Sequence, residues 1–400
     1  MKALRTFFME DWLETFRLKT KYNMGESGGR FRTTKDLILH SGYSEKEAFA
    51  EIMNMPLYDS PNRGREDLRK LVATMHPGAH IDNVLITTGT SEALFLLFRH
   101  LNPKKVALPL PAFQLLYEIP IAMGAKIIPL PIRYDKEGKP FVDALEWKNI
   151  LTSEMPDCIL INNPHNPSGL IFSDEQLEVI TNFVNANNCY LIGDEHYRFL
   201  SSDNMPLGQT LYQNNSKVFV TGSFIKCFGT PGLRIGWCIG NKKSLDVIQN
   251  EKNYTTHTVN PFSEWMAVKV LSNPQSNLFA MIKNEWKENK QILKQFLSYS
   301  KTLYGSVPAG GLVTVLGFKN LLNEESLLHK FELLFNNGIF ILPLSSMELG
   351  QFQFQHEISY KNYELSLINK GFGFRLGLGI SPKEFQLALN KIEDILLANI

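Results

Sequence analysis

The chain has 400 residues, with 41 Lys and Arg against 40 Asp and Glu, and a formal net charge of +1. Hydrophobic residues make up 44% and charged residues 20% of it, values typical of a globular protein that exclude a long disordered or fibrous chain. The balanced charge does not favour nucleic acid as a partner, and no apolar run of about 18 residues predicts a membrane span.

The first 16 residues do not resemble a secretory leader, because Glu10, Asp11 and Glu14 interrupt the stretch where its apolar region would run. The four cysteines form no C-x-x-C pair, which favours neither a disulfide framework nor a zinc site. We therefore expect a cytoplasmic protein without a bound metal.

Short apolar runs alternate with helical patterns through the middle of the chain. Strands are predicted at residues 84–87, 106–110, 125–132, 158–162, 189–193, 218–221 and 235–239. Helices are predicted at residues 91–101, 174–187 and 245–256. This alternation predicts an α/β fold with a mostly parallel sheet and helices on both faces. Ligands of such sheets bind beyond the carboxyl ends of the strands.

The last third of the chain has a different pattern, typical of a smaller α+β domain. It predicts a long amphipathic helix at 277–303, helices at 324–336 and 383–397, and strands at 310–318, 339–344 and 373–379. We expect a large domain at 51–290 and a small domain at 291–400. Residues 1–50 are expected to form an arm that packs on the small domain or on a partner subunit.

The segment 221–236, TGSFIKCFGTPGLRIG, follows a predicted strand and carries three polar groups suited to one ligand. Ser223 and Arg234 suit a phosphate, as a hydroxyl donor and a planar guanidinium. Lys226 beside an anion site indicates an amine that forms a Schiff base. The alternative is a surface loop with a solvated Lys and Arg.

A second segment, TTGTSEA at 87–93, joins a predicted strand to a helix. Its backbone N–H groups around Gly89, with the hydroxyls of Thr90 and Ser91, form an anion site at the helix N-terminus. Ordinary capping of the helix by Ser or Thr is the alternative.

Two further segments end strands with polar side chains. In NNPHNPSG, residues 162–169, the two prolines hold Asn166 as a hydrogen-bond donor, although a simple proline-rich turn is the alternative. In LIGDEHY, residues 191–197, Asp194 ends an apolar strand and needs a partner, which a protonated pyridine nitrogen would supply. Tyr197 could reach a phenolic oxygen on the same ring.

Together these motifs resemble the fold type I pyridoxal 5′-phosphate (PLP) enzymes, specifically the class I/II aminotransferases, over residues 56–375. The resemblance implies a seven-stranded sheet flanked by helices, a smaller α+β domain, and PLP as cofactor. It implies that Lys226 holds PLP and moves the Cα proton of an L-α-amino acid in the external aldimine. Asp194 would keep the pyridine nitrogen protonated, and Asn166 and Tyr197 would bind the ring hydroxyl.

The resemblance assigns the remaining contacts as well. The phosphate ligands would be Gly89, Thr90, Ser91, Ser223 and Arg234. Phe113 would stack on the ring, and Tyr58 would reach the phosphate of the neighbouring subunit, which implies a homodimer with shared active sites. Arg375, in GFRLG, would clamp the substrate α-carboxylate. Core packing is the alternative for Phe113 and Tyr58, and a surface position for Arg375.

The reaction itself stays open between two alternatives. Ile225 and Thr230 depart from the usual aminotransferase motif, but the catalytic groups favour transamination. The arm sequences FMEDWL at 8–13 and YNMGESG at 22–28 resemble capreomycidine synthase-like enzymes, which eliminate water from a hydroxylated arginine and cyclise it. In that case Gly28 would contact the substrate, and Glu10 or Asp11 would hold its guanidinium. Capping of an N-terminal helix is the alternative for both carboxylates.

A PLP-dependent lyase or decarboxylase would use the same cofactor groups. A non-enzymatic effector-binding module fused to a DNA-binding domain is disfavoured, since no basic helix-turn-helix segment is present.

Overall fold

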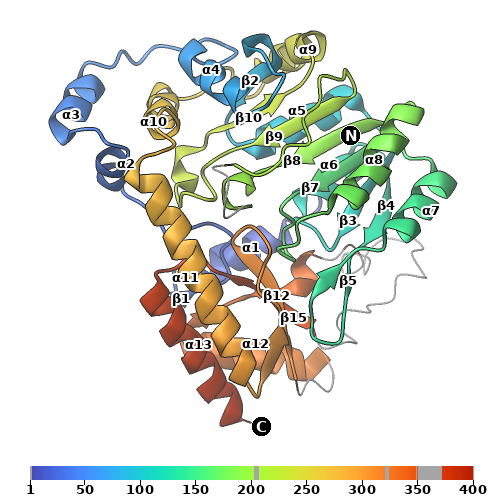
Figure 1. Cartoon of the computed structure of the whole chain (residues 1–400), viewed down its shortest axis with the longest axis vertical. Coiled ribbons are helices and arrows are strands. Elements are labelled where there is room, and N and C mark those ends of the chain that lie inside the picture. The colour runs from blue at the N-terminus through green and yellow to red at the C-terminus, as the bar shows by residue number, and fades with distance from the viewer. Residues whose placement is uncertain (1, 202–206, 320–323, 348, 350–371, 400) are drawn as a thin grey trace.

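The computed structural model describes residues 2–201, 207–319, 324–347, 349 and 372–399. A larger unit with a central sheet lies above a smaller unit in Figure 1, and the long helix α11 (Asn277–Tyr299) runs between them.

The central sheet has seven strands. Their order is β2 (Val84–Thr87), β10 (Gly236–Ile239), β9 (Val218–Gly222), β8 (Tyr190–Asp194), β7 (Cys158–Asn162), β3 (Lys105–Leu110) and β4 (Lys126–Pro131). β10 runs antiparallel to β2 and β9, whereas the other neighbouring strands pair in parallel. The predicted α/β fold with a mostly parallel sheet is therefore confirmed.

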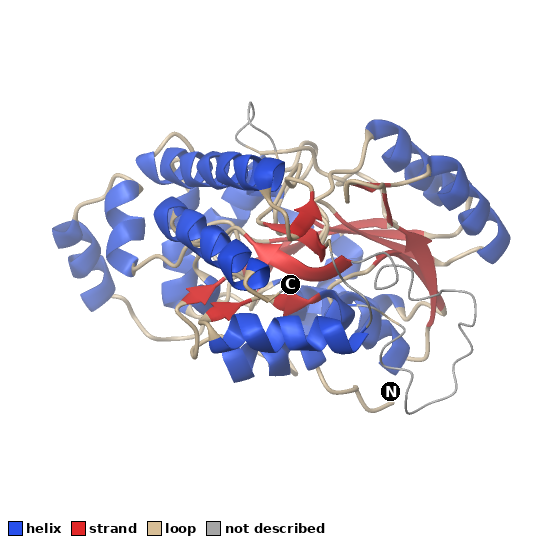
Figure 2. Ribbon diagram, turned by 90° about the horizontal axis from the view of Figure 1, so that it is seen from below, coloured by secondary structure: helices blue, strands red, loops and turns tan. Residues whose placement is uncertain are grey.

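Both faces of this sheet are buried. Along β7, Ile159 and Ile161 join one apolar cluster while Cys158 and Leu160 join another, as the two-residue period of a strand requires. Helices cover both faces (Figure 2). They are α4 (Glu66–Thr74), α5 (Thr90–Leu101), α6 (Leu115–Ala122), α7 (Ala144–Glu154), α8 (Asp174–Ala186), α9 (Lys242–Lys252) and α10 (Pro261–Leu271). The four cysteines are buried and unpaired.

The smaller unit is built on a four-stranded antiparallel sheet. Its order is β11 (Leu303–Gly305), β12 (Val313–Phe318), β15 (Phe372–Gly377) and β14 (Leu342–Pro343). Helices α11, α12 (Glu324–Asn336) and α13 (Pro382–Leu397) pack around it. The pair β5 (Arg133–Tyr134) and β6 (Pro140–Phe141) forms a separate ribbon of the larger unit.

The N-terminal residues contact both units. Helix α1 (Phe8–Phe16) packs against β14, and β1 (Tyr22–Asn23) pairs in parallel with β13 (Ile339–Phe340). Helix α2 (Thr34–His40) contacts α10 and α11, and α3 (Glu45–Met53) follows it. The domain boundaries at residues 50 and 290 stay a prediction, the second of them falling inside α11.

Several predicted element boundaries were wrong. The helix predicted at 277–303 ends at Tyr299, because Ser300 has an extended backbone (ψ 131°) that leads into β11. The helix predicted at 245–256 begins earlier, since the Asn241 side chain caps it by accepting from the Ser244 N–H. The strand predicted at 339–344 is split into β13 and β14. Among the described residues no helix is both long and apolar enough to cross a membrane.

Candidate active site

The first element of the site is a buried carboxylate at the carboxyl ends of three adjacent strands. Strand register places Asn162 of β7 beside Asp194 of β8, and Asp194 beside Thr221 of β9. Asp194 is 2% exposed. Its Oδ1 accepts from the Thr221 hydroxyl (3.1 Å), and its Oδ2 accepts from Asn162 Nδ2 (3.1 Å) and lies 2.9 Å from His196 Nδ1. A carboxylate offers about four acceptor positions. One position on Oδ1 is therefore without a donor among the described residues, which suits a cationic N–H.

The second element is an anion cradle at the N-terminus of α5. Gly89 is the N-cap with φ +84°, and Thr90 and Ser91 are the first two helical residues, so their N–H groups have no partner within the helix. The pairing of β2 with β10 brings Gly236 against this turn, where a Cβ would lie 2.7 Å from the Gly89 carbonyl carbon. Because glycine has no Cβ at this close approach, the backbone N–H groups of the turn stay open to a phosphate.

Two side chains complete the cradle. Arg234 has φ +46°, and its guanidinium lies against Gly89, since a Cβ added there would be 2.8 Å from Nη2. Ser223 is buried directly after β9. The structure thus brings the five predicted phosphate ligands to one edge of the sheet.

The third element is the amine of Lys226, which is half-buried. Its Nζ donates to Ser27 Oγ at 3.2 Å. Burial lowers the pKa of Lys226 from its ordinary value, and the neighbouring Arg375 lowers it further, whereas Glu26 opposes the shift. A lowered pKa increases the fraction of neutral amine, the form that acts as a nucleophile or base.

The fourth element is the guanidinium of Arg375 on β15, which is fully buried. Its Nη2 donates to the Gly25 carbonyl (2.6 Å) and its Nη1 to Asn166 Oδ1 (3.1 Å), while Nε has no partner among the described residues. A buried guanidinium with a free N–H is suited to a carboxylate.

Tyr197 is also fully buried, and its hydroxyl donates to the Ser27 carbonyl at 2.5 Å. Burial raises the pKa of Tyr197, so the phenol stays protonated. Asn166 lies near it through the Arg375 contact, and its own N–H donates to Asn162 Oδ1 at 2.7 Å. The predicted pair therefore shares one cluster, although each side chain is bonded to a different neighbour.

An arm loop, residues 24–29, lies across these groups. A Cβ on Gly28 would lie 3.6 Å from the Lys226 carbonyl oxygen. On the other side, a Cβ on Gly377 would lie 2.0 Å from the Glu26 carbonyl oxygen, so β15 tolerates only glycine there. The arm loop is thus held between the lysine segment of the larger unit and β15 of the smaller unit.

Two carboxylates accompany the arm loop. Arg17, at the end of α1, lies 3.3 Å from Glu10 and 3.6 Å from Glu26. Both carboxylates favour the charged forms of Lys226 and Arg375, which places them beside the site. Asp11, the other predicted guanidinium ligand, is exposed.

The two predicted aromatic contacts differ in position. Phe113 follows β3, is half-buried, and packs on Phe7 with ring centroids 5.5 Å apart, so the arm also contacts it. Tyr58 is 69% exposed and lies outside the cluster, at a surface cavity of about 580 Å³ that Arg65 and Pro261 also line. One chain does not bring Tyr58 to its own site.

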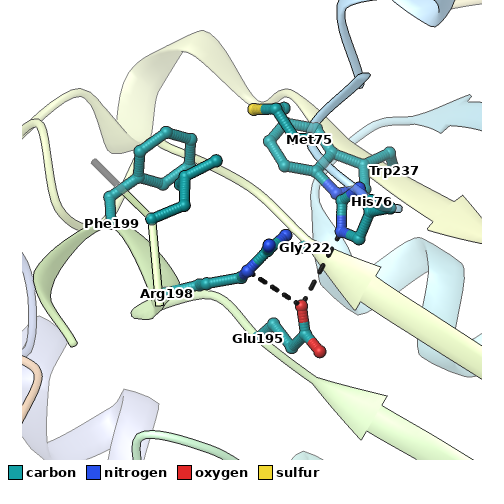
Figure 3. A pocket seen from close by; sticks show the side chains of 8 residues that line it. Met75, His76, Glu195, Arg198, Phe199, Gly222 and Trp237 are labelled. Atoms are coloured by element: carbon teal, nitrogen blue, oxygen red, sulfur yellow. Dashed lines mark ion pairs between the residues drawn. The ribbon is translucent and has the colours of Figure 1, made fainter. Parts of the chain in front are cut away.

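A separate small cavity lies beside Glu195, the residue that follows β8 (Figure 3). Glu195 lies 3.7 Å from both His76 and Arg198 there, and Trp237 lines the same space. Its volume of about 10 Å³ is enough for one water molecule at most. These buried contacts of Glu195 hold the segment that follows β8, and the cavity has no room for a substrate.

Sequence reasoning missed several residues of this cluster. They are Gly25, Glu26, Ser27, Asn162, His196 and Thr221. Asn162 is the first residue of the proline motif and His196 lies within DEHY, so the motifs themselves contained both residues. The arm loop lies within YNMGESG, which carried only a resemblance, and its contacts with Arg375, Lys226 and Tyr197 come from the folded chain.

These groups fit PLP, the cofactor expected from the motifs. Asp194 would receive the ring nitrogen at its free acceptor position, the α5 cradle would hold the phosphate, and Lys226 would bind the aldehyde. Arg375 stays available for a substrate carboxylate.

Comparisons with known proteins show the family to which the chain belongs. The family model for aminotransferase class I and II matches residues 44–357. Capreomycidine synthase of Streptomyces vinaceus is 26% identical over 352 residues, 86% of either chain. A PLP-dependent aminotransferase structure from Streptococcus suis 89-1591 matches with a TM-score of 0.85 at 21% identity, covering 99% of this chain and 98% of that one. The structure of the PLP-dependent cyclase OrfR matches with a TM-score of 0.83 at 20% identity, covering 100% and 99%. The chain therefore belongs to the class I and II aminotransferase family of PLP-dependent enzymes.

Proposed function

We propose that this enzyme transaminates an L-α-amino acid, with Lys226 moving the Cα proton and Arg375 binding the α-carboxylate. The arm loop carries the proposal, because its three consecutive residues 25–27 touch both groups. The Gly25 carbonyl accepts from Arg375, and the Ser27 hydroxyl accepts from Lys226. A carboxylate-binding guanidinium and an amine of lowered pKa therefore lie within one amino acid's reach.

PLP supplies an electron sink for negative charge at the substrate Cα when it is bound. Lys226 takes the proton from Cα as a neutral amine and returns it as an ammonium. Arg375 orients the substrate through its α-carboxylate, and that orientation decides which bond at Cα breaks.

The proposal includes a homodimer in which Tyr58 completes the partner's phosphate site. Tyr58 is exposed in one chain, and four other large apolar side chains of the larger unit are exposed as well. They are Phe49, Met53, Leu57 and Tyr254, each at least 65% exposed. Large apolar side chains that one chain leaves exposed are of the kind that a subunit interface buries.

A second candidate is elimination of water from a hydroxylated arginine followed by ring closure. Glu10 and Glu26 favour it, because two carboxylates beside Lys226 and Arg375 suit a substrate with a cationic side chain. Capreomycidine synthase also matches over 86% of this chain, whereas a transaminase of neutral or acidic amino acids has no need of this pair. In this reaction the hydroxyl group would leave as water, and the guanidine of the same substrate would then add to its carbon chain and close the ring.

One experiment tests both candidates. The PLP-loaded protein is mixed with single amino acids, including arginine and 4-hydroxyarginine, without a 2-oxo acid. Conversion of PLP to pyridoxamine phosphate together with a 2-oxo acid supports transamination. Loss of one water from hydroxyarginine, with PLP regenerated, supports cyclisation instead. Spectra that respond to no amino acid would contradict both.

A further inference from the structure

His196 is the one imidazole in contact with Asp194 in the part of the chain that the structure describes. Its Nδ1 lies 2.9 Å from Asp194 Oδ2 and 3.3 Å from Asn162 Nδ2. It is 7% exposed, its carbonyl accepts from Cys227 Sγ (3.5 Å), and its ring packs on that of Tyr197 with centroids 4.2 Å apart. The imidazole is therefore held in place.

Its neighbours decide which ring nitrogen carries the hydrogen. Asn162 Oδ1 accepts from the Asn166 N–H (2.7 Å), which fixes the orientation of the Asn162 amide. The two hydrogens on Asn162 Nδ2 then have two acceptors already, the Asp194 carbonyl (3.0 Å) and Asp194 Oδ2 (3.1 Å). No hydrogen remains for His196 to accept, so Nδ1 itself carries a hydrogen and donates it to Asp194.

We propose that His196 is a positioning residue whose hydrogen bond to Asp194 Oδ2 directs the cofactor's ring nitrogen to Oδ1. With His196 and Asn162 both donating, Oδ2 has no acceptor position left. Thr221 takes one position on Oδ1, and the last one stays for the ring N–H. The inference rests on PLP as the cofactor and on Asp194 as its nitrogen ligand, and it holds for transamination and cyclisation alike.

The hydrogen bond from His196 also affects the position of the proton that Asp194 shares with the ring nitrogen. A hydrogen bond to a carboxylate stabilises its ionised form. Without the His196 donor the carboxylate binds a proton more strongly, and the proton shared with the ring nitrogen moves toward Asp194. One hydrogen bond to a charged group corresponds to a change of about tenfold in that equilibrium.

The test uses the holoenzyme loaded with PLP labelled with ¹⁵N at the ring nitrogen. In the unsubstituted enzyme the ¹⁵N shift should be that of a protonated pyridine. His196→Phe should move the ¹⁵N shift toward the value of a neutral pyridine. In His196→Asn, whose amide reaches the position of Nδ1, the shift should stay at the value of the unsubstituted enzyme. His165→Phe is the matched control, because His165 Nδ1 bonds Ser168 (2.8 Å) instead of Asp194 and the ¹⁵N shift should not change.

A second measurement needs no substitution. In protein labelled with [¹⁵N]histidine, the signal of His196 should show a protonated Nδ1, and the signal is assigned by its loss in His196→Asn. An unprotonated Nδ1, or a ring-nitrogen shift that His196→Phe leaves unchanged, would overturn the inference. Either result leaves the reaction with amino acids untouched, so failure here is distinct from failure of the proposed function.

Discussion

Replacing Glu26 by Gln removes one negative charge from the arm loop and keeps the size of the side chain. Glu26 has a side chain 19% exposed and lies 3.6 Å from Arg17. A half-buried carboxylate that binds a cationic group contributes about 1.5–3 kcal/mol, or roughly 10- to 100-fold in affinity. A substrate guanidinium must share Glu26 with Arg17, so we expect the lower end, ~10-fold.

The assay compares an amino acid with a cationic side chain and one with an uncharged aliphatic side chain on the PLP-loaded enzyme. Spectral titration gives the dissociation constants of arginine and norleucine for each variant. Glu26→Gln should weaken arginine binding ~10-fold relative to norleucine. Glu14→Gln is the matched control, because Glu14 contacts the same Arg17 (3.6 Å) but its side chain is 78% exposed. An unchanged ratio of the two constants in Glu26→Gln would refute the assignment of this pair to a cationic substrate end.

Three further predictions concern the cofactor, the dimer and pH. Lys226→Ala should abolish the visible absorbance of protein-bound PLP, and a retained band would show that another amine holds it. Mixing Tyr58→Ala with Lys226→Ala subunits should restore activity, because a mixed dimer has one site without either substitution, whereas activity that stays absent would argue against shared sites. Burial lowers the pKa of His165 to about 3. Below its ordinary pKa the unfolded chain binds a proton that folded His165 releases, so the free energy of unfolding should decrease as pH falls from about 6.5 toward 3. Denaturant titrations at pH 7 and 5 should show a smaller decrease in His165→Phe, and an equal decrease would contradict this assignment.

The sequence predicted the sheet, and it predicted that the candidate cofactor residues lie at one edge of it, because both depend on local pattern. Strands β2, β7, β8 and β9 are short apolar runs, and their polar ends carry Gly89, Asn166, Asp194 and Ser223 within a few residues. In a sheet of this kind the carboxyl ends meet at one edge, so motifs far apart in sequence can be placed together from topology alone.

The arm contacts could not be predicted in this way. Glu26 and Ser27 belong to no strand or helix, and they reach Arg17, Lys226 and Tyr197 only because β15 accepts them at close range. The hydrogen bond from His196 to Asp194 depends on the rotamer of the His196 side chain. The sequence pattern does not specify that rotamer. Tyr58 needs a second chain, and its role remains a prediction.

The arm loop has a consequence for how enzymes of this shape diverge. The residues of the same chain that are proposed to bind PLP lie between positions 84 and 240, whereas the two carboxylates proposed to select the substrate lie within the first 26 residues. Mutations in the N-terminal segment can therefore alter the substrate range while the residues of the cofactor site stay unchanged. Exchanging residues 1–30 between relatives is therefore expected to change the substrate specificity while the cofactor site stays the same.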